Sequence, residues 1–150
     1  MDKPKIYIVD DSDDYRFLIQ QIFNKFLPQY LVQFFSGGEI VLKNLFLSAE
    51  QSGEEFPSLI LMDLNMPVLN GYHTLKEIKN PADPVFSFIK RIPVIIMSND
   101  ETADEVNECY RAGANAFLRK PIEFEHLKDL LKSVCYFWLQ VNQMPVMESR

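Results

Sequence analysis

Short apolar runs alternate with longer amphipathic segments along the chain, and this alternation constrains the fold more than any other feature. The runs are apolar at successive positions, which is typical of strands covered on both faces. Between them, apolar residues recur every three or four positions, as on one face of a helix. We therefore predict an α/β fold, a parallel sheet with helices on both faces and right-handed crossovers. The predicted strands are residues 5–11, 30–35, 58–63, 93–98 and 116–120, of which 30–35 is the least regular.

Capping residues, glycine and proline mark the ends of the predicted helices. The first helix should begin near Ser12 and end before Pro28, because proline cannot continue a helix. A later helix within 101–113 should end at Gly113, and the last helix should begin near Glu123. Residues 80–93 contain prolines that break the preceding helix, so we expect a long loop there.

The composition limits the kind of protein that this chain can be. Its 150 residues, 47% hydrophobic and 24% charged, suffice for one buried core and predict a single domain. No run reaches the roughly 18 apolar residues of a membrane span, and the start lacks the apolar centre of a signal peptide, so we expect a cytoplasmic protein. The net charge of -6 disfavours a nucleic-acid surface. Cys109 and Cys135 stand apart and are interpreted as packing residues in a reducing compartment.

Chemically active side chains occur where the predicted strands end. Asp10 and Asp11 end the first strand, Asp63 the third, Ser98 the fourth and Lys120 the fifth. Taken alone, an acid pair after a strand is typical of a helix N-cap, and Ser98 could equally cap the next helix. In a doubly wound sheet, however, ligands bind outside the carboxyl ends of the strands. We therefore expect three acids, a hydroxyl and an ammonium group in one crevice.

Three carboxylates in one crevice predict a bound cation. Two like charges about 4 Å apart repel by roughly 4 kcal/mol at an effective dielectric constant of about 20. Oxygen ligands without histidine or cysteine favour Mg²⁺, which bridges to phosphate oxygens. Because a carboxylate can accept a phosphoryl group, we interpret Asp63 as the acceptor, with Lys120 and Ser98 binding the phosphoryl oxygens.

These residues resemble the pattern of the response-regulator receiver domain, the phosphoacceptor module of two-component signalling. The acid pair, the acceptor within MDLNMPVLNG (62–71), Ser98 and the pair Lys120-Pro121 all match, and the resemblance covers nearly the whole chain. It implies a flavodoxin-like, doubly wound sheet of strand order 2-1-3-4-5 with five helices. It also implies a single receiver domain over 1–150, with a core at about 4–140 and a short C-terminal tail.

The resemblance assigns metal ligands. Asp11, Asp63 and the main-chain carbonyl of Asn65 are expected to bind Mg²⁺, with Asp10 acting mostly through water. Asn65 and Asp100 flank the acceptor, and the resemblance implies that such positions set the lifetime of the phosphate by orienting the attacking water.

The resemblance also implies a switch. Ser98 and Phe117 are expected to respond to phosphorylation, although Phe117 is equally well interpreted as a core residue. The Lys120–Pro121 bond is expected to be cis. Two departures from the family pattern are the serine at 98, where threonine is commoner, and Asn99, which is larger than the usual alanine or glycine and narrows access to the phosphoryl group.

The resemblance implies partners as well. The chain is similar to stand-alone receivers that take phosphate from a sensor histidine kinase, and more specifically to regulators paired with bacterial phytochrome kinases. The last helix is apolar on nearly all sides at its end, which indicates that a second surface covers it. We expect either a tail folded back onto its own domain, or a homodimer or kinase-docking face built from the fourth helix, fifth strand and fifth helix. The residues of this face are Tyr110, Tyr136, Phe137 and Trp138.

Other functions remain as alternatives. A haloacid-dehalogenase-type phosphatase uses a D-x-D pattern after its first strand, and Asp11 and Asp13 match it. That family needs a further acid pair at the end of a later strand, whereas Glu123, Glu125 and Asp129 lie on a predicted helix. A receiver-like interaction module that works without phosphorylation is disfavoured by the complete set of acids, Ser98 and Lys120. A flavin-binding flavodoxin is disfavoured because no phosphate loop rich in Ser, Thr or Gly follows the first strand.

Overall fold

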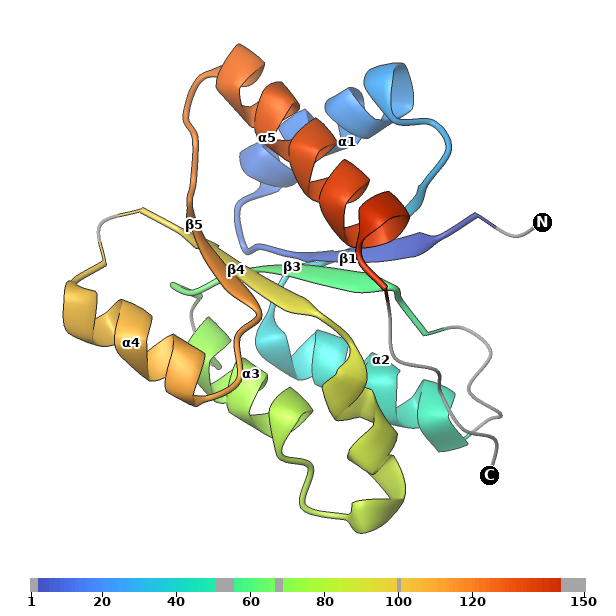
Figure 1. Cartoon of the computed structure of the whole chain (residues 1–150), viewed down its shortest axis with the longest axis vertical. Helices are drawn as coiled ribbons and strands as arrows, with labels where there is room; N and C mark the ends of the chain where they lie inside the picture. Colours follow the sequence, from blue (N-terminus) through green and yellow to red (C-terminus); the bar gives the residue numbers. More distant parts are fainter. Residues whose placement is uncertain (1–2, 51–55, 67–68, 100, 144–150) are drawn as a thin grey trace.

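The computed structural model describes residues 3–50, 56–66, 69–99 and 101–143, and it contains a five-stranded parallel sheet. The strand order is β2-β1-β3-β4-β5, which confirms the predicted class and order (Figure 1). The strands are β1 (Lys5–Val9), β2 (Leu31–Phe35), β3 (Leu59–Asp63), β4 (Val94–Ser98) and β5 (Ala116–Arg119). The α-helices are α1 (Asp13–Phe26), α2 (Gly38–Glu50), α3 (Gly71–Lys79), α4 (Ala103–Arg111) and α5 (Phe124–Tyr136), joined by the 3-10 helix η1 (Pro84–Arg91) and the π-helical turn η2 (Phe137–Val141).

Helices cover both faces of the sheet. α1 and α5 lie on one face, and α2, α3 and α4 lie on the other (Figure 1). Successive residues of a strand point to opposite faces, so each strand contributes to both layers. In β1, Ile6 and Ile8 join the cluster that includes α1 and α5, whereas Tyr7 and Val9 join the cluster that includes α2 and α3. This two-sided covering explains why the strands are continuous apolar runs in the sequence.

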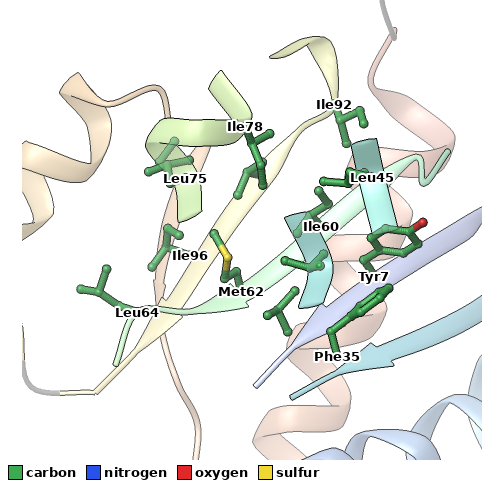
Figure 2. Close-up of a cluster of buried hydrophobic side chains, with 14 of the residues drawn as sticks. Tyr7, Phe35, Leu45, Ile60, Met62, Leu64, Leu75, Ile78, Ile92 and Ile96 are labelled. Carbon is green, nitrogen blue, oxygen red and sulfur yellow. The ribbon is translucent and has the colours of Figure 1, made fainter. Parts of the chain in front are cut away.

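The two central strands are the most deeply buried part of the molecule. All five residues of β3 and all five of β4 are buried. Figure 2 shows one layer of this core, in which Ile60 and Met62 of β3 face the side chains of α2 and α3. Each large apolar side chain buried in this way stabilises the fold by about 1.5–3 kcal/mol. β3 and β4 are therefore a firm base for the polar residues at their ends.

The first helix has the predicted boundaries. Ser12 is its N-cap, and the Ser12 hydroxyl accepts a hydrogen bond from the main-chain nitrogen of Tyr15 at 3.2 Å. The helix starts at Asp13 and ends at Phe26, and its C-cap Leu27 directly precedes Pro28. The cap satisfies one of the free amide groups of the first turn, so the chain turns into α1 immediately after the acid pair.

The fourth helix is capped by Thr102 and not by Ser98. Thr102 and Glu105 form a capping box, in which each side chain accepts a hydrogen bond from the main chain of the other. Ser98 is thereby left for the site. After the helix, Gly113 has a φ of 111°, a left-handed conformation that glycine adopts without steric cost, so the predicted end of this helix is confirmed.

Residues 80–93 differ from the predicted long loop. Pro84 to Arg91 form η1, with Asp83 as the N-cap and Ile89 buried in the core. Lys79, at the end of α3, donates hydrogen bonds from Nζ to the carbonyl oxygens of Lys90 at 2.9 Å and Ile92 at 2.8 Å. The prolines in this stretch do break α3, but Pro84 also starts the short helix, because its fixed φ suits a first helical position.

The last helix continues into η2, and part of this extension folds back onto the domain. Trp138 and Leu139 pack against the cluster beneath α1 and α5. Gln140 Nε2 donates to the Tyr30 hydroxyl at 2.8 Å. Tyr136 and Phe137 are 61% and 50% exposed. Among the residues described, no helix combines the length and apolar character needed to cross a membrane.

Candidate phosphoacceptor site

The ends of three adjacent strands bring polar side chains together at one edge of the sheet. Asp10 directly follows β1, and Asp63 and Ser98 are the last residues of β3 and β4. These side chains are buried: the residues are 4%, 8% and 1% exposed, respectively. The main-chain nitrogen of Asp10 donates to the carbonyl of Phe35 at 3.0 Å, so the hydrogen-bond ladder extends into the site and fixes this acid. The predicted meeting of these residues at the sheet edge is what the structure shows.

Three carboxylates form an acidic cluster at this edge. Oxygen atoms of Asp10, Asp11 and Asp63 all lie within 4.8 Å of one another, with Asp11 exposed and the other two buried. The pKa of Asp63 is raised from 3.8 to about 6, first by burial and then by the charge of Asp10, with a smaller contribution from Asp11. Lys120 and the main-chain amide of Asn65 oppose this rise in pKa. The cluster therefore favours any positive charge that enters it.

Lys120 supplies one such charge from the end of β5. Its Nζ lies 2.7 Å from Oδ2 of Asp10 and 3.5 Å from Oδ2 of Asp63. The lysine side chain is only 11% exposed, so this ion pair is largely screened from water by protein. The main-chain nitrogen of Lys120 donates to the carbonyl of Ser98 at 2.8 Å, which continues the pairing of β4 with β5. The predicted function of Lys120 as a cation at the acceptor agrees with this placement.

The predicted cis bond between Lys120 and Pro121 is wrong. No peptide bond among the described residues is cis. From a trans backbone, Lys120 still reaches both carboxylates, and the Pro121 carbonyl accepts a hydrogen bond from the Tyr15 hydroxyl at 3.1 Å. Trans is the lower-energy form of an X-Pro bond by about 0.5–1 kcal/mol, and these contacts are all made without the cis form.

Tyr15 of α1 also belongs to the site, although it was not identified as a site residue from the sequence. Lys120 Nζ lies 4.2 Å from the centre of its ring, within the range of a cation–π contact. Burial raises the pKa of the Tyr15 hydroxyl well above its usual range, and the charges of Asp10 and Asp63 raise it further. Tyr15 therefore stays a neutral hydrogen-bond donor on the side of the cluster formed by α1. Its position three residues after the N-cap Ser12 was the available signal.

Asn65 and Ser98 meet on the other side of Asp63. The main-chain nitrogen of Asn65 donates to Oδ1 of Asp63 at 3.2 Å, and Nδ2 of Asn65 donates to the Ser98 hydroxyl at 3.3 Å. Nδ2 also donates to Oε2 of Glu101 at 3.0 Å, a contact that sequence reasoning missed because Glu101 lies in a loop and ends no strand. Asp100, the other residue predicted to set the phosphate lifetime, lies outside the described residues.

Gly71 allows β3 and α3 to approach each other closely. A Cβ atom at this position would lie 2.3 Å from the carbonyl oxygen of Asp63 and 2.8 Å from Cα of Leu64. Both of these are main-chain atoms, which cannot move aside cheaply. The main-chain nitrogen of Gly71 donates to the carbonyl of Leu64 at 2.8 Å, which links the start of α3 to the residue after Asp63. The absence of a side chain at Gly71 is therefore a condition for the position of Asp63.

The structure places Phe117 against the hydrophobic core. Its side chain is half-buried against the core cluster of α2, α3 and α4, and its main-chain nitrogen donates to the Tyr110 hydroxyl at 3.1 Å. The interpretation of Phe117 as a core residue therefore agrees with the structure. Tyr110 itself is 47% exposed on α4, whereas Trp138 of the predicted face is half-buried.

The second acid of the phosphatase-like D-x-D pattern does not join the cluster. Asp13 has a side chain that is 91% exposed, and it pairs with Arg16 one turn along α1. Arg16 also donates to the carbonyl oxygen of Asp10. On α5, Glu125 pairs with Lys128 at 2.7 Å, and its side chain is 70% exposed. The alternative of a haloacid-dehalogenase-type phosphatase therefore lacks the acids that its chemistry requires.

The donor set of the cluster fits a hard divalent cation. The three carboxylates offer oxygen atoms in one small volume, and the histidine and cysteine ligands that softer metals prefer are absent from it. Asp10 and Asp63 are buried while Asp11 is exposed, which leaves one side for metal-bound water. These features match the preferences of Mg²⁺ and Mn²⁺.

Sequence comparisons agree with this geometry. The family model described as the response regulator receiver domain matches residues 6–132. Response regulator Rcp1 from Synechocystis sp. is 28% identical over 140 residues, which cover 93% of this chain and 92% of Rcp1. The two-component response regulator ORR5 from Oryza sativa is 33% identical over 131 residues, which cover 87% of this chain and 88% of ORR5.

Comparisons with solved structures give the same picture. The phosphorylated cyanobacterial phytochrome response regulator RcpA superimposes with a TM-score of 0.82 at 29% identity, over 97% of this chain and 100% of RcpA. The Mn²⁺-bound form of Rcp1 gives a TM-score of 0.79 at 27% identity, over 95% of this chain and 99% of Rcp1. One of these relatives has therefore been seen phosphorylated and the other with a divalent metal ion.

Proposed function

Because the chain belongs to the response regulator receiver domain family, we propose that it accepts a phosphoryl group on Asp63 in a reaction that depends on Mg²⁺. The observation that carries the proposal is the meeting of three carboxylates with Lys120 at one sheet edge. In this proposal the chain is a phosphoacceptor switch, and the only reactions it promotes are its own phosphorylation and dephosphorylation.

In the transfer, an oxygen of Asp63 attacks the phosphorus of a phosphohistidine. The new bond joins phosphorus to this carboxylate oxygen, and the bond from phosphorus to the histidine nitrogen breaks, with its electron pair leaving on the imidazole. The Lys120 ammonium, 3.5 Å from Oδ2 of Asp63, balances negative charge on the phosphoryl oxygens. The Ser98 hydroxyl, buried beside the acceptor, donates a hydrogen bond to one of them.

We propose that the metal ion is held by Asp10, Asp11, Asp63 and the main-chain carbonyl of Asn65. When bound, the ion supplies positive charge that neutralises the phosphoryl oxygens and the carboxylates around them. The relative Rcp1, solved with Mn²⁺, supports a divalent metal, and the all-oxygen donor set favours Mg²⁺.

Phosphorylation changes the hydrogen bonds at the acceptor and so acts as a switch. The phosphoryl group adds roughly two negative charges and new acceptor oxygens. Ser98 then turns from Asn65 Nδ2, its present partner at 3.3 Å, toward a phosphoryl oxygen. β5 follows through the pairing of Ser98 with Arg119, which shifts Phe117 and the α4 surface that its main chain contacts.

Intact-mass measurement tests the proposal. The protein is incubated with acetyl phosphate and Mg²⁺, and the expected result is the mass of one added phosphoryl group. Asp63→Asn and wild type in EDTA should both stay unmodified, because the first lacks the nucleophile and the second the metal. Full modification of Asp63→Asn would contradict the assignment of the acceptor.

We propose a sensor histidine kinase as the phosphate donor, and specifically one of the phytochrome type. Receiver domains take phosphate from such kinases. The narrower assignment is supported by the likeness to RcpA, which is described as a phytochrome response regulator. Transfer from a phosphorylated phytochrome kinase should be faster than transfer from an unrelated histidine kinase under equal conditions, and equal rates would argue against this pairing.

We further propose a homodimer through the face of α4, β5 and α5. Tyr110, Tyr136 and Phe137 are 47%, 61% and 50% exposed, and β5 is an edge strand. Burying such aromatic side chains is a strong source of association energy. Light scattering at high concentration should give twice the chain mass, and Phe137→Ser should restore the monomer mass. A monomer in wild type, with and without phosphorylation, would refute the dimer.

A further inference from the structure

Glu101 touches the site from the loop between β4 and α4. Its Oε2 accepts a hydrogen bond from Asn65 Nδ2 at 3.0 Å, and the same nitrogen donates to the Ser98 hydroxyl at 3.3 Å. The second carboxylate oxygen, Oε1, is buried without a hydrogen-bond partner among the described residues. Because leaving this oxygen unpaired is costly, the hydrogen bond that Oε2 accepts from Asn65 is an important favourable contact of the carboxylate.

The chemistry of a carboxylate fixes the orientation of the Asn65 amide. An ionised carboxylate only accepts hydrogen bonds, so the end of the amide that faces Glu101 must be the NH₂ group. Ser98 lies at the same nitrogen. The amide oxygen of Asn65 is thereby turned away from both contacts, in a residue that is exposed and adjacent to the acceptor. Without Glu101, the amide could rotate and present its NH₂ group in place of its oxygen.

We propose that Glu101 is a positioning residue that holds Asn65 so that its amide oxygen orients the water attacking phosphorylated Asp63. This inference rests on the proposed function. In the hydrolysis, the water oxygen bonds to phosphorus, the bond from phosphorus to the Asp63 oxygen breaks, and Asp63 leaves as a carboxylate. Both water protons end on the product, dihydrogen phosphate. A hydrogen-bond acceptor held beside the water orients the lone pair of the water oxygen toward phosphorus. This orientation speeds the attack.

A double-mutant cycle tests the inference. Each variant is phosphorylated with acetyl phosphate and Mg²⁺, the donor is removed, and loss of the phosphoryl group is followed by intact mass. Glu101→Ala should slow the loss on the order of fivefold, as expected when one orienting hydrogen bond is removed. Glu101→Gln should keep the wild-type rate, because its amide oxygen accepts the same hydrogen bond. In the Asn65→Ala background, Glu101→Ala should have no further effect.

Asp104→Ala is the matched control, because it removes an exposed acid from the first turn of the neighbouring helix α4. It should leave the rate of loss unchanged. An unchanged rate in Glu101→Ala, equal slowing by Glu101→Gln, or additive effects of the Glu101 and Asn65 variants would each overturn the inference. If wild type gains no phosphoryl group at all, the proposed function fails and takes this inference with it, whereas normal gain with an unchanged rate of loss overturns the inference alone.

Discussion

Lys120 holds together two buried carboxylates that repel each other. Its Nζ lies 2.7 Å from Asp10 and 3.5 Å from Asp63, and the Tyr15 ring covers it. The raised pKa of Asp63, about 6, shows that the lysine offsets only part of the burial and of the like-charge repulsion. Without a metal ion, repulsion between the carboxylates of the site therefore lowers the free energy of unfolding. The arrangement that suits the proposed function is thus not the most stable one.

Neutralising the acceptor should stabilise the metal-free protein. In EDTA at neutral pH, we expect Asp63→Asn to raise the free energy of unfolding by about 1 kcal/mol, because it removes a buried like charge while Lys120 keeps Asp10 as a partner. Urea denaturation measures this. The control Asp104→Asn removes an exposed acid and should stay within about 0.5 kcal/mol of wild type. A less stable Asp63→Asn would show that the cluster is not strained.

The amine of Lys79, which lies outside the site, predicts that the free energy of unfolding depends on pH. Burial lowers its pKa from 10.5 to about 8 in the folded protein. Between these two values the unfolded chain binds the proton that the folded protein has released, so the free energy of unfolding rises with pH across this window. The advantage of wild type over Lys79→Met should therefore grow from pH 8 to pH 10. For the control Lys76→Met, an exposed lysine on the same helix, the difference should stay constant.

One result would contradict this prediction for Lys79. If the difference in unfolding free energy between wild type and Lys79→Met does not change over this pH range, the amine titrates normally in the folded protein. Its hydrogen bonds to the carbonyl oxygens of Lys90 and Ile92 would then stabilise the charged amine enough to offset its burial.

The junction of β3 with α3 sets where the acceptor lies. β3 is buried along its whole length, and the chain turns into α3 within a few residues, where Gly71 packs against the main chain of Asp63. Asn70 caps α3 by accepting a hydrogen bond from the main-chain nitrogen of His73 at 2.9 Å. Helix and strand thus fix the acceptor from both sides, which gives the side chain little freedom.

Gly71→Ala tests this junction. The added Cβ would meet the Asp63 carbonyl oxygen at 2.3 Å, so we expect destabilisation by about 1–3 kcal/mol and weaker Mg²⁺ binding, because the acceptor must move. Denaturation and a magnesium titration measure the two effects. Gly37→Ala is the matched control, since a Cβ there meets nothing within 4 Å and should leave both unchanged. Normal metal affinity in Gly71→Ala would contradict the link between this glycine and the site.

Across the whole molecule, the sheet collects at one edge the ends of strands that lie far apart in the chain. β1, β3 and β4 are adjacent in the sheet order, and their ends carry Asp10, Asp63 and Ser98. These residues come together only in the folded chain. A ligand that binds them therefore also stabilises the fold. Metal binding should therefore be measurable as a change in global stability.

Mg²⁺ should raise the midpoint of thermal unfolding. A ligand at about 100 times its dissociation constant adds about 2.7 kcal/mol to the free energy of unfolding when it binds only the folded state. Asp11→Asn removes one carboxylate of the cluster and should reduce the shift at a given Mg²⁺ concentration. Asp104→Asn should keep the wild-type shift. Equal shifts in Asp11→Asn and wild type would place the metal elsewhere.

The sequence predicted the sheet and the strand-end residues for a physical reason. A strand covered on both faces must be apolar throughout, so a carboxylate at its end, as at Asp63, stands out from the pattern. Contacts that depend on loop paths or backbone isomers carry no such pattern. Three features are of this kind: the contact of Glu101 with Asn65, the trans bond before Pro121, and the short helix η1 in a stretch rich in proline. The contact of the Tyr15 ring with Lys120 is likewise one that no pattern in the sequence marks.

Locating the phosphoryl group in the chain tests the central claim most directly. After reaction with acetyl phosphate and Mg²⁺, borohydride reduction converts an aspartyl phosphate into homoserine, and peptide mass spectrometry then finds the changed residue. The account predicts homoserine at Asp63 alone, with none at Asp10 or Asp11. A phosphorylated protein whose modified residue lies anywhere other than Asp63 would contradict it.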